Sequence, residues 1–193
     1  IDNNAIVEKK WAEGNRDEAF FSSDGTTLTG DVFNVSKNGT YTVFAKDSAG
    51  NISLQTITIT NIDIEKPTIT LKPSTLNPTN AQIEVDVQAT DNVSIVELKW
   101  AEGNQTAGYF STNGTDISNN AFQVSDNGMY TVYAKDSAGN ETVEVITINN
   151  LDFDAPVITL IPETVDPINT AIHVDVEVVD GNPIIEKKWA KGS

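Results

Sequence analysis

Carboxylate and amide side chains stand close together in several short segments of this sequence. The loop Asp-Ser-Ala-Gly-Asn occurs twice, beginning at Asp47 and at Asp136, and the segment NIDIEKP carries two acids. Ca²⁺ binds about six to eight oxygens from carboxylates, amides and carbonyls. We therefore consider a calcium site with the following ligands: Asp63, Glu65, Asp91, Asp136 and Asn140.

The repeated loop also has a simpler interpretation. An Asp side chain accepts hydrogen bonds from backbone amides two residues on, and Gly139 is suited to positive φ, so Asp136 to Asn140 is a good hairpin turn. Acids in turns and linkers repel one another only weakly at physiological salt. The sequence alone leaves both roles open.

Enzymatic chemistry has little support. The chain has no cysteine, which excludes disulfides and thiolate metal sites. Its one histidine, His173, excludes a pair of histidines for zinc, and no Ser-His-Asp triad can be argued from it. His173 lies on a predicted strand and is expected to be a surface residue. No glycine-rich phosphate loop occurs. We predict that the chain is not an enzyme.

The acidic balance limits the partners. Lys+Arg 12 against Asp+Glu 28 gives a net charge of −16, which repels nucleic acid and anionic lipid. No apolar run approaches the roughly 20 residues of a membrane span. We predict no nucleic-acid partner and no membrane insertion.

A period of 89 residues runs through the whole chain, as Trp11, Trp100 and Trp189 show. Tyr41 and Tyr130 keep the same spacing. Such a period indicates tandem domains, each long enough to bury its own core.

Alternating and β-branched segments predict an all-β fold. In the third strand of the unit, Val96, Leu98 and Trp100 are expected on one face. Seven short strands in one period are typical of a β-sandwich. The predicted strands of the complete unit are 68–72, 82–89, 95–101, 107–110, 121–125, 129–135 and 141–149.

Two residues point to an immunoglobulin-like (Ig-like) sandwich. Trp100 stands on the third strand, and Tyr130 stands two residues before Val132, as in a tyrosine corner. The segments KPTITLKPSTLNPTN, ATDNVSIVELKWAEGN and NGMYTVYAKDSAGNETVEVITI resemble the bacterial Ig-like repeats of Gram-positive cell-surface proteins. The resemblance covers essentially the whole chain. It implies stalk repeats of the adhesin or S-layer type, on the bacterial cell surface or secreted.

The repeat divides the chain into a complete domain, 64–152, and two partial ones. Residues 1–62 carry the third to seventh strands (C to G), and residues 154–193 carry the first to third (A to C). So short a C-terminal piece cannot bury a core alone. Two explanations stay open: the chain is a window from a longer array, or copies join head to tail by strand exchange into an open fibre.

The Ig-like topology places the candidate ligands. The loops between strands two and three and between strands six and seven lie where the chain enters the sandwich. Asp91, Asp136 and the linker acids Asp63 and Glu65 are thus expected at one interdomain junction. Calcium there would stiffen the joint.

The predicted function is a non-catalytic structural spacer, whose important residues form the core: Val85, Val87, Trp100, Tyr130 and Val132. Its partners are neighbouring repeats or head-to-tail copies. One alternative is an adhesion module for host protein or glycan, with the variable region 102–120 as its surface. Another is a self-assembling fibre or S-layer subunit joined by strand complementation.

Overall fold

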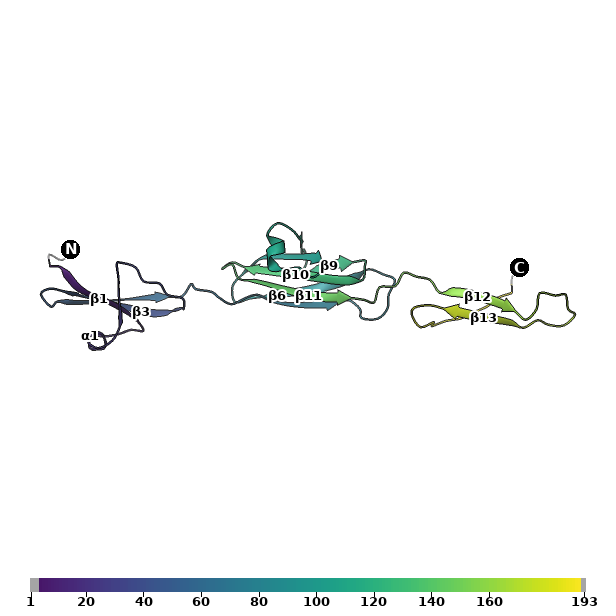
Figure 1. The fold of residues 1–193 in the computed structure, drawn as a ribbon, viewed down its shortest axis with the longest axis horizontal. Coiled ribbons are helices and arrows are strands. Elements are labelled where there is room, and N and C mark those ends of the chain that lie inside the picture. Colours follow the sequence, from purple (N-terminus) through teal and green to yellow (C-terminus); the bar gives the residue numbers. More distant parts are fainter. Residues whose placement is uncertain (1–3, 192–193) are drawn as a thin grey trace. The chain divides into compact units, whose positions relative to one another are not determined.

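The structure is a computed structural model, and it describes residues 4–191. Strands dominate, with two short helical turns, α1 (Glu18–Phe21) and η1 (Ala107–Ser111) (Figure 1). The chain separates into two compact units, Ile1–Glu65 and Lys66–Ser193. Across 4–191, no helix has the length and apolarity required to span a membrane.

The second unit contains a complete Ig-like sandwich, hereafter the middle domain. Its first sheet has the order β5-β6-β9 and its second the order β11-β10-β7-β8. Every pairing within these sheets is antiparallel. The strands are β5 (Thr68–Pro73), β6 (Ile83–Thr90), β7 (Ile95–Glu102), β8 (Thr115–Asp116), β9 (Ala121–Val124), β10 (Gly128–Asp136) and β11 (Glu141–Ile148). The all-β, Ig-like prediction is confirmed.

Side chains from both sheets share one core. Val85 and Val132 are fully buried, and the Trp100 ring packs on this core, stacked on Phe122 at 4.7 Å between centroids. The Tyr130 hydroxyl donates to the Asp126 carbonyl at 2.7 Å, which completes a tyrosine corner. The core prediction for these residues is therefore confirmed.

The strand predicted at 107–110 is wrong. These residues form η1, and the short strand β8 pairs with β7 in its place. Phe110 is fully buried and stacks on Tyr133 at 5.0 Å, on the face of β10 away from the main core. A helical turn delivers Phe110 to that face, and a short apolar run does not distinguish such a turn from a strand.

A β-bulge changes the face of one residue in β7. Lys135 pairs with Glu97 but the next residue, Asp136, pairs with Ile95, so the register skips Val96. Val96 is consequently 56% exposed, and Ile95 packs on the core with Leu98 and Trp100. The prediction that Val96 shares their face is wrong, because a bulge breaks the alternation of side chains.

The N-terminal unit has one sheet in its described part, with the order β2-β1-β3-β4. Each strand stands 89 residues before its counterpart in the β11-β10-β7-β8 sheet, and Tyr41 repeats the corner by donating to the Lys37 carbonyl at 2.7 Å. Within residues 4–65 no second sheet accompanies it. The strands are β1 (Ile6–Glu13), β2 (Thr26–Thr27), β3 (Gly39–Asp47) and β4 (Ile52–Ile59).

The C-terminal part of the second unit forms a hairpin of β12 (Val157–Pro162) and β13 (Val174–Val179). Its register repeats that of β5 with β6: Val157 pairs with Val179 as Thr68 pairs with Thr90. His173 directly precedes β13 and is exposed, beside Asp175 at 2.8 Å, as its predicted surface position requires.

Candidate metal centre

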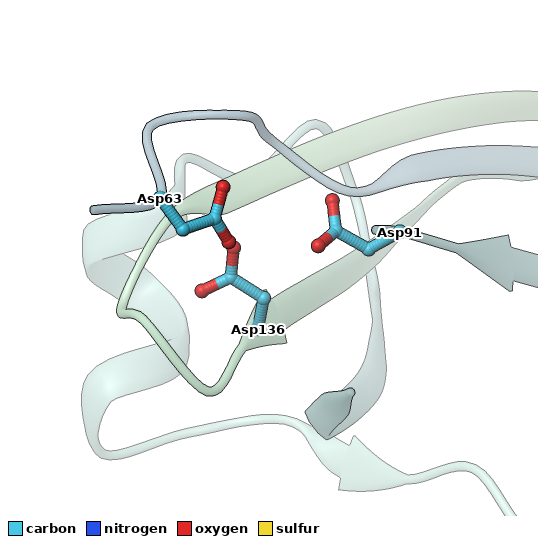
Figure 2. A group of neighbouring side chains, drawn as sticks. All are labelled: Asp63, Asp91 and Asp136. Atoms are coloured by element: carbon cyan, nitrogen blue, oxygen red, sulfur yellow. The ribbon is translucent and has the colours of Figure 1, made fainter. Parts of the chain in front are cut away.

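Three carboxylates converge where the chain enters the middle domain. Asp63, Asp91 and Asp136 each offer an oxygen, and these oxygens lie within 4.8 Å of one another. Asp63 belongs to the segment that leads into β5, Asp91 follows β6 and Asp136 ends β10. In Figure 2 the carboxylates of Asp63 and Asp136 face each other, and that of Asp91 lies beside them.

Asp136 is the most firmly held of the three and is only 1% exposed. Its Oδ1 accepts from the Gly139 amide at 2.6 Å and the Asn140 amide at 2.8 Å, and its Oδ2 accepts from the Asn140 side chain at 2.8 Å. Burial acts to raise the pKa of Asp136, but the hydrogen bonds from Asn140, Gly139 and Ala138 outweigh it and hold this pKa below its usual range. The carboxylate is therefore charged at neutral pH.

The other two carboxylates are oriented by their own loops. Asp91 Oδ2 accepts from the Val93 amide at 3.0 Å, and Asp63 Oδ1 accepts from the Glu65 amide at 3.1 Å. The Ser137 amide donates to the Ser94 carbonyl at 2.9 Å, which joins the loop after β10 to the loop after β6. Backbone contacts thus bring Asp91 and Asp136 together.

This arrangement has the chemistry of a cation site. Three carboxylate groups share a small volume, and the Oδ2 atom of Asp63 is buried from solvent. Like charges so close together favour either protonation or a bound cation. Since the pKa of Asp136 is held low, the triad could hold a metal ion.

The two remaining predicted ligands occupy different places. Asn140 is adjacent to the group, but the hydrogen bond in which its amide nitrogen donates to Asp136 makes it a positioning residue. The Glu65 side chain is exposed and lies outside the three-carboxylate group found in residues 4–191. Whether either binds a metal stays a prediction.

Parts of the same arrangement recur one period away. Asp47, 2% exposed, accepts from the Ala49 and Asn51 amides at 2.9 and 2.8 Å, as its counterpart Asp136 does from its own loop. In the hairpin region Asp152 and Asp180 correspond to Asp63 and Asp91. Asn182 connects them, donating its side-chain amide to Asp152 and its backbone amide to Asp180.

Two asparagines near the linkers have a role that the sequence analysis missed. Asn127 exchanges two hydrogen bonds with the backbone of Leu151, at 2.8 and 3.0 Å. Asn38 makes the same pair with Ile62, at 2.8 and 2.9 Å. Each anchors the segment that leaves its own domain. Their Asn-Gly context suggested only a turn, although their 89-residue spacing was visible.

The sequence comparisons give one distant relative. No protein-family model matches the chain. It is 28% identical over 176 residues to hyalin of Strongylocentrotus purpuratus, an alignment that covers 84% of this chain and 13% of hyalin. The chain thus spans about an eighth of that protein's length.

Solved structures are also similar to this chain, and two of them are described here. The full ectodomain of mouse nectin-like molecule 4, with three Ig domains, aligns over 75% of this chain and 55% of its own, with 16% identity and a TM-score of 0.32. Murine CEACAM1b aligns over 77% and 87%, with 12% identity and a TM-score of 0.33. The strand order described above, and not these scores, is what identifies the fold: the chain is made of tandem Ig-like repeat domains.

Proposed function

We propose that this chain is a non-catalytic structural spacer of an extracellular protein. The main support for this proposal is that the sheet order, the corner tyrosine and the acidic loop all recur at the 89-residue period. The features that repeat are core residues and turns rather than catalytic groups. Such a row of domains is suited to holding other parts of a protein at a fixed distance. The resemblance to Gram-positive surface repeats supports a bacterial cell surface as its location.

We further propose that Ca²⁺ binds at Asp63, Asp91 and Asp136. Three carboxylates suit a hard cation with oxygen ligands, and Ca²⁺ tolerates irregular geometry better than Mg²⁺ does. The ion would connect the segment that enters the middle domain to that domain's own loops. In a spacer, such a connection reduces bending at the linker.

Calorimetric titration of the 193-residue chain with CaCl₂ tests the calcium proposal. We expect binding with a Kd of about 10⁻⁴–10⁻³ M, as in extracellular calcium modules. At about 100 times the Kd, the ion would stabilise the middle domain by about 2.7 kcal/mol. The melting temperature should fall on addition of a chelator, and MgCl₂ should not substitute.

Asp91→Asn is the informative variant, because an Asn oxygen still accepts from the Val93 amide while the charge is lost. Asp86→Asn is its matched control, since Asp86 is an exposed residue on β6 outside the group. We expect Asp91→Asn to bind calcium at least about tenfold more weakly than the natural chain. Asp86→Asn should bind calcium as tightly as the natural chain does. Equal calcium binding by both variants would reject the site.

A further inference from the structure

The segment that leaves the middle domain, 150–152, is bonded to the loop between β5 and β6. The Thr79 amide donates to the Asn150 carbonyl at 2.9 Å, and the Asp152 amide donates to the Thr79 carbonyl at 2.9 Å. These two bonds form a parallel β-bridge between Thr79 and Leu151. The chain therefore adds a short piece of parallel strand after β11 has ended.

Two side chains of this segment add to the attachment. Asn150 donates its side-chain amide to the Thr75 carbonyl at 3.3 Å and to the Asn77 carbonyl at 2.8 Å. The partners of Asn150 lie 75 and 73 residues earlier, so these bonds join the two ends of the domain's sequence. Leu151 is 7% exposed and packs in the main core. The segment is thus part of the domain and not a free connection.

Asn127 holds the same segment from a second loop. It directly precedes β10 and exchanges hydrogen bonds with the Leu151 backbone at 2.8 and 3.0 Å. Asn38 makes the equivalent pair with Ile62, so this attachment recurs at the period of the repeat. We name the contacts that hold the segment 150–152 the exit latch, which is formed by three residues: Thr79, Asn127 and Asn150.

The exit latch lies on the path by which tension would leave the domain. The middle domain begins with β5 and ends with β11, so a force on the chain beyond Asp152 reaches β11 through the segment 150–152. Because Thr79 and Leu151 run parallel, that force acts along the bridged strands and across their hydrogen bonds. Bonds loaded in this way must break together, whereas those of a hairpin pulled open from one end break one after another.

From this geometry we propose that the exit latch is the main tension-bearing contact of the middle domain. While the latch holds, it transfers the load to the loop between β5 and β6 and to Asn127. Once it breaks, the load falls on β11, which in the described part of the chain is paired with β10 alone. The inference rests on the proposed function, since only a spacer under tension makes use of such a contact.

Pulling single molecules of the 193-residue chain by their two ends at constant force tests the proposal. The measurements are made in chelator, so that the result does not depend on the proposed calcium site. Opening of the middle domain is identified by the length that it releases, because residues 67–152 extend to roughly 30 nm. The quantity measured is the time for which this domain survives under load.

Two variants weaken the latch by different amounts. Asn127→Ala removes both hydrogen bonds to Leu151 and should shorten the lifetime under load at least about tenfold. Asn150→Ala leaves the backbone bridge intact and should have a smaller effect. Asn104→Ala is the matched control and should leave the lifetime unchanged. Asn104 is an exposed amide in the loop after β7, at the same end of the domain.

A second loading geometry separates a mechanical role from a contribution to stability. The natural chain has no cysteine, so Thr106→Cys provides a single attachment point on an exposed residue after β7. When the chain is pulled by its N-terminal end and by this cysteine, no force passes through the segment 150–152. Asn127→Ala should then shorten the lifetime much less than it does under end-to-end load.

Equal shortening in the two geometries would overturn the proposal, because Asn127 would then contribute only to stability. Unchanged lifetimes of both latch variants under end-to-end load would also overturn it, and would leave the spacer proposal standing. Natural middle domains that open at the lowest measurable load would count against a spacer under tension, and would overturn both proposals.

Discussion

The hairpin β5–β6 of the middle domain and the C-terminal hairpin β12–β13 are two copies of the same segment in different surroundings. β5–β6 and β12–β13 have the same length of loop between paired positions and the same register, yet one buries its valines and the other exposes them. Local sequence and hairpin pairing are therefore not what makes Val87 a core residue. The opposing sheet does this, because an alternating strand presents an apolar face that only a second layer removes from water.

The same comparison applies to the acidic groups. Near β5 and β6, three carboxylates meet because β10 brings the third, Asp136. Near β12 and β13 the counterparts of the other two, Asp152 and Asp180, are present with an amide connecting them. The group of three carboxylates in this repeat thus depends on the completed sandwich.

The largest expected difference between the two regions concerns their tryptophans. Trp100→Ala removes a ring stacked on Phe122 and should cost about 3–5 kcal/mol, enough to unfold the middle domain or nearly so. Trp189, its counterpart, is 89% exposed, so Trp189→Ala should leave the melting temperature of dilute chain unchanged. Thermal unfolding followed by circular dichroism measures both. Equal effects would contradict the comparison.

A smaller difference is expected for the paired valines. Val87→Ala should lower the free energy of unfolding by about 2 kcal/mol, since it empties space in a closed core. Val176→Ala should have no measurable effect in dilute chain, because the side chain is 55% exposed. Urea denaturation of both variants measures the difference. An equal loss of stability in the two variants would contradict the comparison.

The corner tyrosine is expected to contribute less. Tyr130→Phe removes the hydrogen bond to the Asp126 carbonyl and should cost about 1 kcal/mol. Tyr109→Phe is the control, because Tyr109 is 36% exposed on η1. Urea midpoints compared at equal slope measure the cost. A midpoint shift no larger for Tyr130→Phe than for the control would show that the corner is not stabilising.

The smallest effect appears only in acid. Burial raises the pKa of Asp136 but the hydrogen bonds of its loop lower it by more, so the folded state favours the charged form. Its contribution to stability is therefore present above the unfolded pKa of about 3.9 and is lost as pH falls through the lowered folded pKa.

Unfolding in chelator between neutral pH and about pH 2 measures this acid limb. Asp136→Asn should flatten it for the middle domain, whereas Asp47→Asn should not, because Asp47 belongs to the N-terminal unit. An unchanged slope in Asp136→Asn would show that other carboxylates determine the acid limb.

Much of the fold and part of the site could be predicted from the sequence. Periodicity and alternation located β5, β6, β10 and β11, and the spacing of Trp100 and Tyr130 indicated an Ig-like core. Both failures, at 107–110 and at Val96, have a tertiary cause. Phe110 is held by Tyr133, and the bulge at Val96 depends on how β7 pairs with β10.

What the sequence by itself determined is the repeat, an 89-residue unit of alternating strands, turns and acidic loops. Period and alternation are visible along the chain without knowledge of which segments pack together. Only the tertiary structure decided which acids meet. Asp63, Asp91 and Asp136 come from three segments, and Glu65, equally near in sequence, points to solvent. It also decided which apolar faces are covered, since burial depends on a second sheet that the hairpin cannot supply for itself.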